Sequence, residues 1–344
     1  MIKPDAGLAG ESLDRAAISS AWETICGARR TVALTHANPD ADAVASLLAL
    51  TDLCVRAGHE VVPAVGDGEL PDTLRFLPGA ARLVPPEDLS LDGVDLLVML
   101  DCADEMRVGP TFKRHPEWFD GRIPIVNIDH HVTNTRFGSI NLIDPDSAAT
   151  AELLGLMFLE LGIDFDADVA TCLLAGVQGD TLGLRTPSTR ARTLRLAAVL
   201  LERQADLDTV VDNLFRVKPF STVRLWGLVL SRAQQLGPVV WAEITPEMLA
   251  TSGAAAAEGE GIVNFLAGSK GSRVGALLYQ QPDGWRVSLR SVREDVNVAE
   301  LARRYGGGGH PRAAGCRLAP GDEARDNFLA DLAARLNVLP LIGG

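Results

Sequence analysis

Two mainly apolar runs, at residues 94–101 and 123–129, constrain the fold most. Runs of this length without polar alternation are typical of β-strands that are covered on both faces, as in a parallel sheet. Another predicted strand, at 31–36, precedes an amphipathic segment at 42–58 that ends at Gly58, so strands and helices alternate along the first half. The sequence therefore predicts an α/β fold with a mainly parallel sheet flanked by helices.

The chain has 344 residues, more than a single hydrophobic core usually supports. We expect a larger domain at 1–187, a helical connector at 188–234 and a smaller α+β domain at 235–344. In the smaller domain, a Pro-Asp-Gly turn at 282–284 separates two predicted strands. We expect the functional site in a cleft between the two domains. Within the larger domain, Ser147 is the predicted N-cap of one helix, and Asp166 is that of the next.

Composition excludes several classes of protein. No apolar stretch reaches the length of a membrane helix, and the first residues lack the apolar core of a signal peptide, so we expect a cytoplasmic protein. The five cysteines are odd in number and lack C-x-x-C spacing, which argues against a disulfide framework or a zinc knuckle. A formal charge of −13 opposes binding to long nucleic acids, because that affinity comes from many Lys and Arg contacts to phosphate.

Polar clusters follow three of the predicted strands. In chain order the clusters are His36, Asn38, Asp40 and Asp42; Asp101 and Asp104; and Asp129, His130 and His131. A further acid, Asp180, lies in a glycine-bounded loop after a helix. Because ligands bind beyond the carboxyl ends of strands in open α/β sheets, we expect these side chains to converge. Adjacent residues of a strand point to opposite faces, so His130 and His131 cannot serve one packing surface.

Four carboxylates and two imidazoles in one crevice would perturb one another's pKa values unless cations neutralised them. Two divalent metal ions would do so. Aspartate oxygen and imidazole nitrogen suit manganese, iron or zinc, whereas a site for magnesium alone seldom needs histidine, and we expect Mn²⁺. Asp40 and Asp42 can each reach a different ion, and Asp101 is the best candidate for an acid that bridges the two.

Each polar residue also has a purely structural interpretation. A single His or Asp at a strand end is more often a helix cap or a hydrogen-bonded loop residue than a metal ligand, and we keep that interpretation for Asp104. Independent caps do not readily explain several clusters at successive element ends in one domain.

Five segments together resemble the DHH phosphoesterase superfamily with its DHH-associated C-terminal domain. They are "THANPDADAVAS", "LDCAD", "NIDHHVTN", "GDTLGLRTPST" and "GGGGHPRAAG". The resemblance covers nearly the whole chain and is strongest to the bacterial nano-RNase/pAp phosphatase group. It implies a hydrolase that degrades very short oligoribonucleotides to mononucleotides and removes the 3'-phosphate of pAp. The acid loop of this family often reads D-T-G, whereas here Leu182 follows Thr181.

The resemblance also implies roles for individual residues. One metal ion would be held by His36, Asp40 and Asp101, and the other by Asp42, Asp101, His130 and Asp180. His131 would face the scissile phosphate, and Asp129 would orient the imidazoles without itself binding a metal ion. Two ions held in this way would acidify a water for in-line attack on phosphorus. Whether His131 protonates the leaving group or only binds a phosphoryl oxygen stays open at this point.

The smaller domain is expected to bind the rest of the substrate. Residues 261–318 contain nine Lys or Arg and four acids, a local charge of +5 that fits a small anionic ligand. A glycine run such as 306–309 has two interpretations, a flexible turn or a phosphate-binding backbone. The resemblance implies that the substrate-binding residues are Arg290, Ser291, Gly307, Gly308, Gly309, His310 and Arg312, with Ser291 and Arg312 as weaker candidates and Asn264 weaker still.

Two other functions remain possible from the sequence. One is a phosphodiesterase dedicated to cyclic or linear di-AMP, and the other is a non-catalytic nucleotide-binding regulator that kept the fold. All six expected metal ligands are present, which favours an enzyme over a regulator. We expect short single-stranded RNA, pAp or di-adenylate as partners and neither duplex nucleic acid nor a membrane, while the oligomeric state stays open, a homodimer included.

Overall fold

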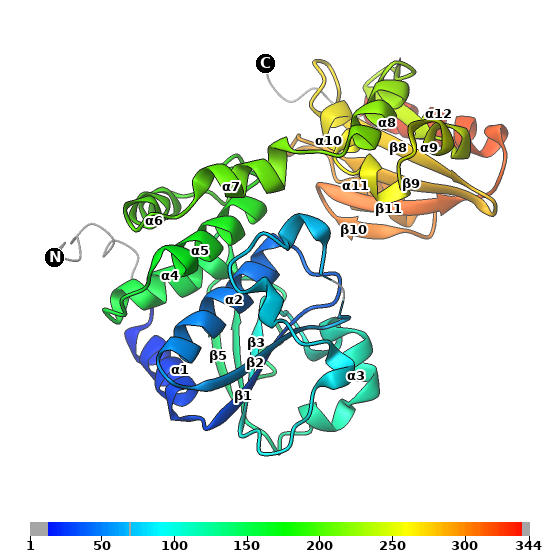
Figure 1. Cartoon of the computed structure of the whole chain (residues 1–344). Coiled ribbons are helices and arrows are strands. Elements are labelled where there is room, and N and C mark those ends of the chain that lie inside the picture. Colours follow the sequence, from blue (N-terminus) through cyan, green and yellow to red (C-terminus); the bar gives the residue numbers. More distant parts are fainter. Residues whose placement is uncertain (1–12, 69, 339–344) are drawn as a thin grey trace. The chain divides into compact units, whose positions relative to one another are not determined.

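The structure is a computed structural model that describes residues 13–68 and 70–338 (Figure 1). The chain divides into two compact units after Val217, and each unit is described by itself. In the first unit the helices are α1 (Arg15–Gly27), α2 (Ala41–Arg56), α3 (Pro110–Arg114), α4 (Thr150–Glu160), α5 (Ala167–Asp180), α6 (Ala191–Glu202) and α7 (Leu207–Val211). Its strands are β1 (Arg30–Thr35), β2 (Glu60–Val65), β3 (Leu96–Leu100), β4 (Ile125–Asp129) and β5 (Ile140–Ile143).

The first sheet has the strand order β2-β1-β3-β4-β5, and all its neighbouring strands are parallel. This confirms the α/β fold and the parallel sheet that the apolar runs predict. Successive residues of β1 belong to hydrophobic cores on opposite faces of the sheet. Ala33 packs with α1, α2, α4 and α5, whereas Val32 and Leu34 pack with Val108 and Trp118 on the other face. Both faces of the sheet are covered, which explains why its central strands have no polar alternation.

Helix α2 differs from the amphipathic helix that the sequence predicts. It begins after Asp40, whose side chain accepts a hydrogen bond from the Ala43 N–H at 3.1 Å. Every residue from Ala41 to Cys54 is buried, because α5 covers the side of α2 that faces away from the sheet. The polar residues of α2 as far as Asp52 are therefore enclosed by protein, and one of them is Asp42.

One of the two predicted helix caps is confirmed and the other is wrong. Asp166 caps α5, and its side chain accepts a hydrogen bond from the Val169 N–H at 3.2 Å. Ser147 does not cap α4, which begins at Thr150 with Ala149 as its N-cap. The hydroxyl of Ser147 instead donates to Oδ2 of Asp144 at 2.8 Å.

The second unit contains a mixed sheet of order β10-β11-β9-β8-β7-β6, in which only β7 and β8 are parallel among the described pairs. Its strands are β6 (Gln234–Leu236), β7 (Val239–Ile244), β8 (Val274–Gln281), β9 (Gly284–Arg290), β10 (Gly308–His310) and β11 (Ala313–Leu318). Its helices are α8 (Phe220–Leu230), α9 (Pro246–Ser252), α10 (Ile262–Ala267), α11 (Val298–Arg303) and α12 (Asp322–Val338). In the described part of the chain, none of the helices combines the length and hydropathy needed to cross a membrane.

Candidate functional site

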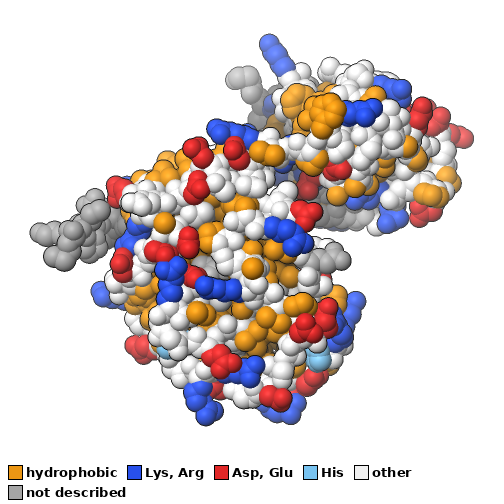
Figure 2. All heavy atoms as spheres, in the orientation of Figure 1, with side chains coloured by type: hydrophobic (Ala, Val, Ile, Leu, Met, Phe, Trp, Pro, Cys, Tyr) orange, Lys and Arg blue, Asp and Glu red, His pale blue; other side chains and the backbone are white. Residues whose placement is uncertain are grey.

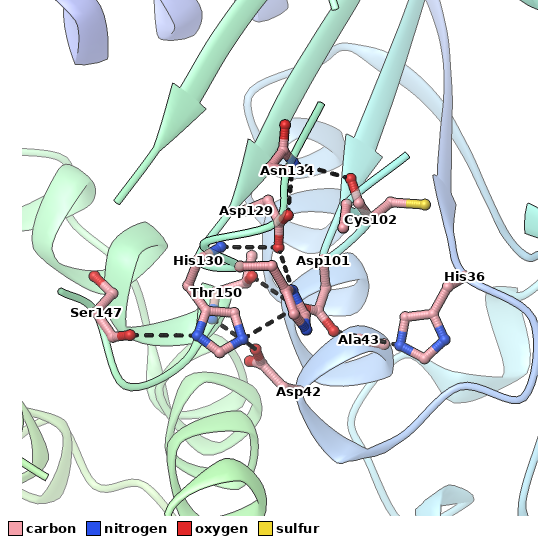
Figure 3. A network of polar contacts seen from close by, with 12 residues as sticks. His36, Asp42, Ala43, Asp101, Cys102, Asp129, His130, Asn134, Ser147 and Thr150 are labelled. Carbon is pink, nitrogen blue, oxygen red and sulfur yellow. Dashed lines mark hydrogen bonds and ion pairs between the residues drawn. The ribbon is translucent and has the colours of Figure 1, made fainter. Parts of the chain in front are cut away.

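The side chains predicted to bind metal converge at one edge of the first sheet. β1, β3 and β4 are adjacent and parallel, so their carboxyl ends carry His36, Asp101 and His130 to the same edge. Asp40 and Asp42 reach this edge from the start of α2, and Asp180 is the last residue of α5 rather than part of a loop. Figure 3 shows His36, Asp42 and His130 arranged around Asp101.

His36, Asp40 and Asp101 form the first group whose ligand atoms lie within 4.8 Å of one another. Nδ1 of His36 lies 2.9 Å from the Ala37 carbonyl oxygen. Because a carbonyl only accepts, Nδ1 carries a proton, which leaves Nε2, 3.4 Å from Oδ2 of Asp101, as the atom that would bind a metal ion. A neutral imidazole oriented in this way is suited to bind a metal ion.

A second group with the same spacing contains Asp42, His130 and Asp180. Nδ1 of His130 lies 3.3 Å from the Ser147 carbonyl oxygen, so the same argument leaves Nε2 as the ligand atom. Nε2 is 3.2 Å from Asp180 and 3.9 Å from Asp42, yet it makes no well-aligned hydrogen bond to either carboxylate. A buried nitrogen placed between carboxylates in this way fits a cation between them.

Asp101 occupies the centre of the cluster. It belongs to the first group and to a third group with Asp129, His130 and His131, and its Oδ1 lies 3.5 Å from Nε2 of His130. Its backbone has a φ of +56°, a left-handed conformation that is uncommon outside glycine, asparagine and aspartate. In this conformation the carboxylate lies between the imidazoles of His36 and His130, just after β3.

The sequence gives no sign of the contacts that the start of α4 makes with this cluster. The backbone N–H groups of Thr150 and Ala151 donate to the two carboxylate oxygens of Asp42 at 2.6 and 2.9 Å. The hydroxyl of Thr150 donates to Oδ1 of Asp101 at 2.9 Å. Negative charge is favourable at a helix N-terminus, so the start of α4 holds the carboxylate of Asp42 in place.

Gly176 of α5 allows this close packing. A Cβ at this position would lie 2.5 Å from Cβ of Ala151 and 2.7 Å from Oδ1 of Asp42. We expect Gly176→Ala to destabilise the protein by about 1–3 kcal/mol through overpacking. Gly227 in α8 is the matched control, because a Cβ there meets nothing within 4 Å. Gly227→Ala should stabilise the protein by up to about 1 kcal/mol in chemical denaturation, and equal effects of the two substitutions would contradict this account.

The cluster perturbs the pKa values of its own members. Burial opposes a charge on His130, but the surrounding carboxylates, Asp180 foremost, outweigh burial and raise the pKa of His130 to about 10. Burial raises the pKa of Asp180. Burial would also raise the pKa of Asp101, but the hydrogen bond with His36 and the other nearby imidazoles lower it overall. Without a cation, the cluster is therefore held together by protons on its imidazoles.

Metal affinity should consequently rise with pH. An ion binds neutral imidazole and ionised carboxylates, whereas the ion-free cluster holds a proton on His130 below pH 10. Each binding event displaces about one proton, so the apparent affinity for Mn²⁺ should rise about tenfold per pH unit between about pH 6 and 8. Calorimetric titration in buffers of different ionisation enthalpy measures both the affinity and the proton release. An affinity that is constant over this range, with no proton released, would refute the coupling.

His131 has different partners from His130. Its Nδ1 donates to Oδ1 of Asp129 at 2.7 Å, and the buried Asp129 also accepts the His130 N–H at 2.8 Å. Oδ2 of Asp129 accepts a hydrogen bond from Nδ2 of Asn134 at 2.6 Å, a contact that the sequence interpretation missed (Figure 3). Asn134 fixes Asp129, and Asp129 fixes the tautomer of His131, whose Nε2 remains able to face a substrate.

The loop after Asp180 follows an unusual path. Leu182 has a φ of +50°, Gly183 of +76° and Leu184 of +64°. The leucine that stands in place of the family's usual glycine therefore adopts the left-handed conformation that glycine would take without strain. Asp180 itself precedes this loop and stays in helical conformation within the second metal-ligand group.

The predicted substrate-binding residues lie in the second unit. His310 of β10 is paired with Ala313 of β11, and Ala313 is paired with Arg290 of β9, so the side chains of His310 and Arg290 flank a short alanine on one face of the sheet. Arg312 forms a 3.5 Å ion pair with Glu294. Ser291 is buried, and its hydroxyl donates to the Arg273 carbonyl oxygen at 2.7 Å.

Only the second half of the glycine run, Gly308 and Gly309, belongs to the edge strand β10, and Gly306 lies in the turn before it. A Cβ at Gly307 would lie 2.0 Å from the Gly315 carbonyl oxygen, and one at Gly309 would lie 2.4 Å from the Ala313 carbonyl oxygen. These two glycines are required for β10 to pair with β11. Gly308 differs, because a Cβ there meets nothing within 4 Å. Asn264 lies in the short helix α10, in the same unit.

Comparisons with known proteins agree with this geometry. A family model for the N-terminal domain of the DHH family matches residues 30–177, and the DHHA1 domain matches residues 243–337. The bifunctional oligoribonuclease and PAP phosphatase NrnA of Thermus thermophilus is 35% identical over 83% of this chain and 82% of its own length. The chain belongs to the DHH family. The enzyme of the same name from Bacillus subtilis is 29% identical to this DHH protein over 86% of the chain and 91% of its own length.

Solved structures support the same fold. An exopolyphosphatase-related protein from Bacteroides fragilis matches this DHH protein with a TM-score of 0.85 and 23% identity, over 95% of this chain and 99% of the other. The exonuclease RecJ, in a crystal structure bound to manganese, matches with a TM-score of 0.51 and 17% identity, over 96% of each chain. At these identities the likeness establishes the fold, and the carboxylates and imidazoles described above form the cluster in this DHH protein that could hold metal.

Proposed function

We propose that this DHH protein is a metal-dependent phosphodiesterase and phosphatase. It would hydrolyse short oligoribonucleotides to mononucleotides and remove the 3'-phosphate of pAp, the activities named for its relatives. The observation that carries the proposal is the gathering of four carboxylates and two imidazoles, each imidazole oriented by a backbone carbonyl, at the carboxyl edge of a parallel sheet.

The donor set fits two divalent ions, and we propose Mn²⁺ because oxygen and imidazole ligands are mixed. His36, Asp40 and Asp101 would hold one ion, and Asp42, Asp101, His130 and Asp180 the other. Bound ions supply positive charge for the phosphoryl oxygens and acidify a water nucleophile.

The remaining predicted residues would act on the substrate directly. Nδ1 of His131 donates to Asp129, which leaves Nε2 for the substrate; with the imidazole protonated, Nε2 would donate a proton or a hydrogen bond to the departing or phosphoryl oxygen. Arg290 and His310 share one face of the second sheet and would bind a phosphate or a nucleobase of the substrate. The backbone at Gly308 would approach the ligand closely, because there is open space where a side chain would stand.

Charge distribution supports a short substrate. The net charge is −13, and on the face in Figure 2 basic side chains are interspersed with acidic ones rather than gathered into a long basic track. We therefore propose short single-stranded RNA and pAp as substrates and expect no binding to long duplexes. Linear di-adenylate has the same chemistry as a dinucleotide and should be hydrolysed. The five free cysteines are consistent with action in the reducing cytoplasm, as a monomer or a homodimer.

Initial rates test the proposal. The purified full chain is stripped with a chelator, reconstituted with Mn²⁺, and assayed on a dinucleotide, a pentanucleotide, pAp and cyclic di-AMP under identical conditions. We expect turnover of the dinucleotide and pAp only after metal is restored. Turnover of cyclic di-AMP alone would favour a dedicated di-AMP phosphodiesterase. Tight nucleotide binding without turnover of any substrate would favour a non-catalytic regulator instead.

A further inference from the structure

Residues 147–151 contact three of the six predicted metal ligands. The Ser147 carbonyl oxygen lies 3.3 Å from Nδ1 of His130. Thr150 and Ala151 donate their N–H groups to Asp42, and the Thr150 hydroxyl donates to Asp101. A shift of this short segment would move or turn all three ligands together. Whatever fixes the segment therefore controls the geometry of the metal centre.

A buried ionic network fixes both ends of this segment. Arg192, from α6, contacts Oδ2 of Asp144 at 2.7 Å, and its Nε lies 3.3 Å from Oε1 of Glu152. Its guanidinium also donates to the Ser147 hydroxyl at 3.2 Å. Arg192 thus pairs with one acid before the segment and one acid after it, although it lies some forty residues further along the chain.

Glu152 completes the network from within α4. It is fully buried, and its Oε2 accepts the Ala148 N–H at 2.6 Å. Its Oε1 accepts the hydroxyl of Thr193 at 3.0 Å. Glu152 therefore satisfies a backbone donor just before the helix while it binds two residues of α6. The segment is held by side chains that are not themselves members of the metal-ligand groups.

We propose that Arg192 and Glu152 are positioning residues for the metal centre, an inference that rests on the proposed metal-dependent function. A buried ion network is an expensive way to stabilise a fold, because apolar residues of similar volume often serve as well. The function of the Arg192–Glu152 network is to fix residues 147–151. This segment orients His130, binds both carboxylate oxygens of Asp42 and binds Asp101. Precise ligand placement needs support of this kind from neighbouring groups.

The test compares two arginines of the same region after the same substitution. Arg192→Lys keeps the positive charge, but the single ammonium group of lysine cannot contact Asp144 and Glu152 together as the guanidinium does. Glu152→Gln keeps the shape of the side chain and removes its negative charge. Arg203→Lys is the matched control, because Arg203 pairs with Asp164 at 2.6 Å and binds the Phe165 carbonyl oxygen at the other end of α4. Thr193→Val is a milder variant, because it removes only the hydroxyl that donates a hydrogen bond to Glu152. Mn²⁺ affinity of the metal-free full chain is measured by calorimetry, alongside the midpoint of denaturant unfolding.

We expect Arg192→Lys and Glu152→Gln to weaken Mn²⁺ binding by about 10- to 100-fold, with a smaller loss in Thr193→Val and little change in Arg203→Lys. Wild-type affinity in both network variants, or an equal loss in Arg203→Lys, would overturn the positioning role while leaving the proposed function intact. A wild-type protein that binds no Mn²⁺, or binds it as tightly after Asp101→Asn, would overturn both the inference and the proposed function.

Discussion

Replacing Asp101 by asparagine should lower kcat for a dinucleotide by about 10³-fold or more. Asp101 is the carboxylate shared by two of the three potential ligand groups, and it lies within 3.5 Å of both His36 and His130. Asparagine keeps the size and one oxygen but removes the negative charge that would attract both ions. We expect Mn²⁺ affinity to fall together with the rate, which separates this effect from a defect in substrate binding.

Asp104 provides the matched control for this substitution. It follows the same strand, is likewise an aspartate, and belongs to none of the three potential ligand groups. Asp104→Asn should leave kcat and Mn²⁺ affinity within about a factor of two of the wild type. If Asp104→Asn were as damaging as Asp101→Asn, the loop as a whole rather than the central carboxylate would be responsible. If Asp101→Asn kept full activity, the metal centre would have to lie elsewhere.

The sheet and the convergence of the ligands could be predicted because both follow from local patterns. Apolar runs without alternation indicate strands covered on both faces, and parallel neighbours necessarily present their carboxyl ends at one edge. Polar residues placed directly after those runs therefore had to meet. The approximate bounds of α2, β3 and β4 follow from the same apolar patterns together with Gly58 as a helix stop signal.

The start of α4 could not be predicted, because long-range contacts determine it. Serine is a favoured N-cap, so the sequence pointed to Ser147. In the structure its hydroxyl is bound to Asp144, while the first amides of the helix are satisfied by Asp42, which lies 108 residues earlier. A cap supplied by a carboxylate so far away in the sequence cannot be recognised from the residues near the start of the helix. The Arg192 network was missed for the same reason, since its partners are set by the packing of α6 on α4 and α5.

The glycine run shows a different limit of sequence reasoning. A run of four glycines suits a mobile turn, a ligand-binding backbone or a crowded strand equally well. Only the pairing of β10 with β11 distinguishes Gly307 and Gly309, which have no room for a Cβ, from Gly308, which does. The structure thus assigns a packing reason to two of these glycines, whereas a Cβ at Gly306 or Gly308 would meet nothing within 4 Å.

Replacing His131 by alanine should lower kcat for a dinucleotide by about 10²- to 10⁴-fold while leaving Mn²⁺ binding nearly unchanged. His131 lies beside the cluster, but its Nδ1 is engaged by Asp129 and its ring is 33% exposed, as expected for a group that meets substrate. His115 is the matched control, because it is also 33% exposed and also pairs with a carboxylate, Glu117, at 3.2 Å. His115→Ala should retain the wild-type rate.

The choice of leaving group then separates the two roles of His131. A ribose alkoxide needs a proton to depart, whereas a nitrophenolate departs readily without one. If His131 is the general acid, His131→Ala should be severely impaired on a dinucleotide and far less impaired on bis(p-nitrophenyl) phosphate. If His131 only binds a phosphoryl oxygen, both substrates should lose rate by a similar factor, because both develop the same charge on phosphorus oxygens. A variant with wild-type rates on both substrates would remove His131 from the mechanism altogether, and Asp129 and Asn134 would then have only a structural role.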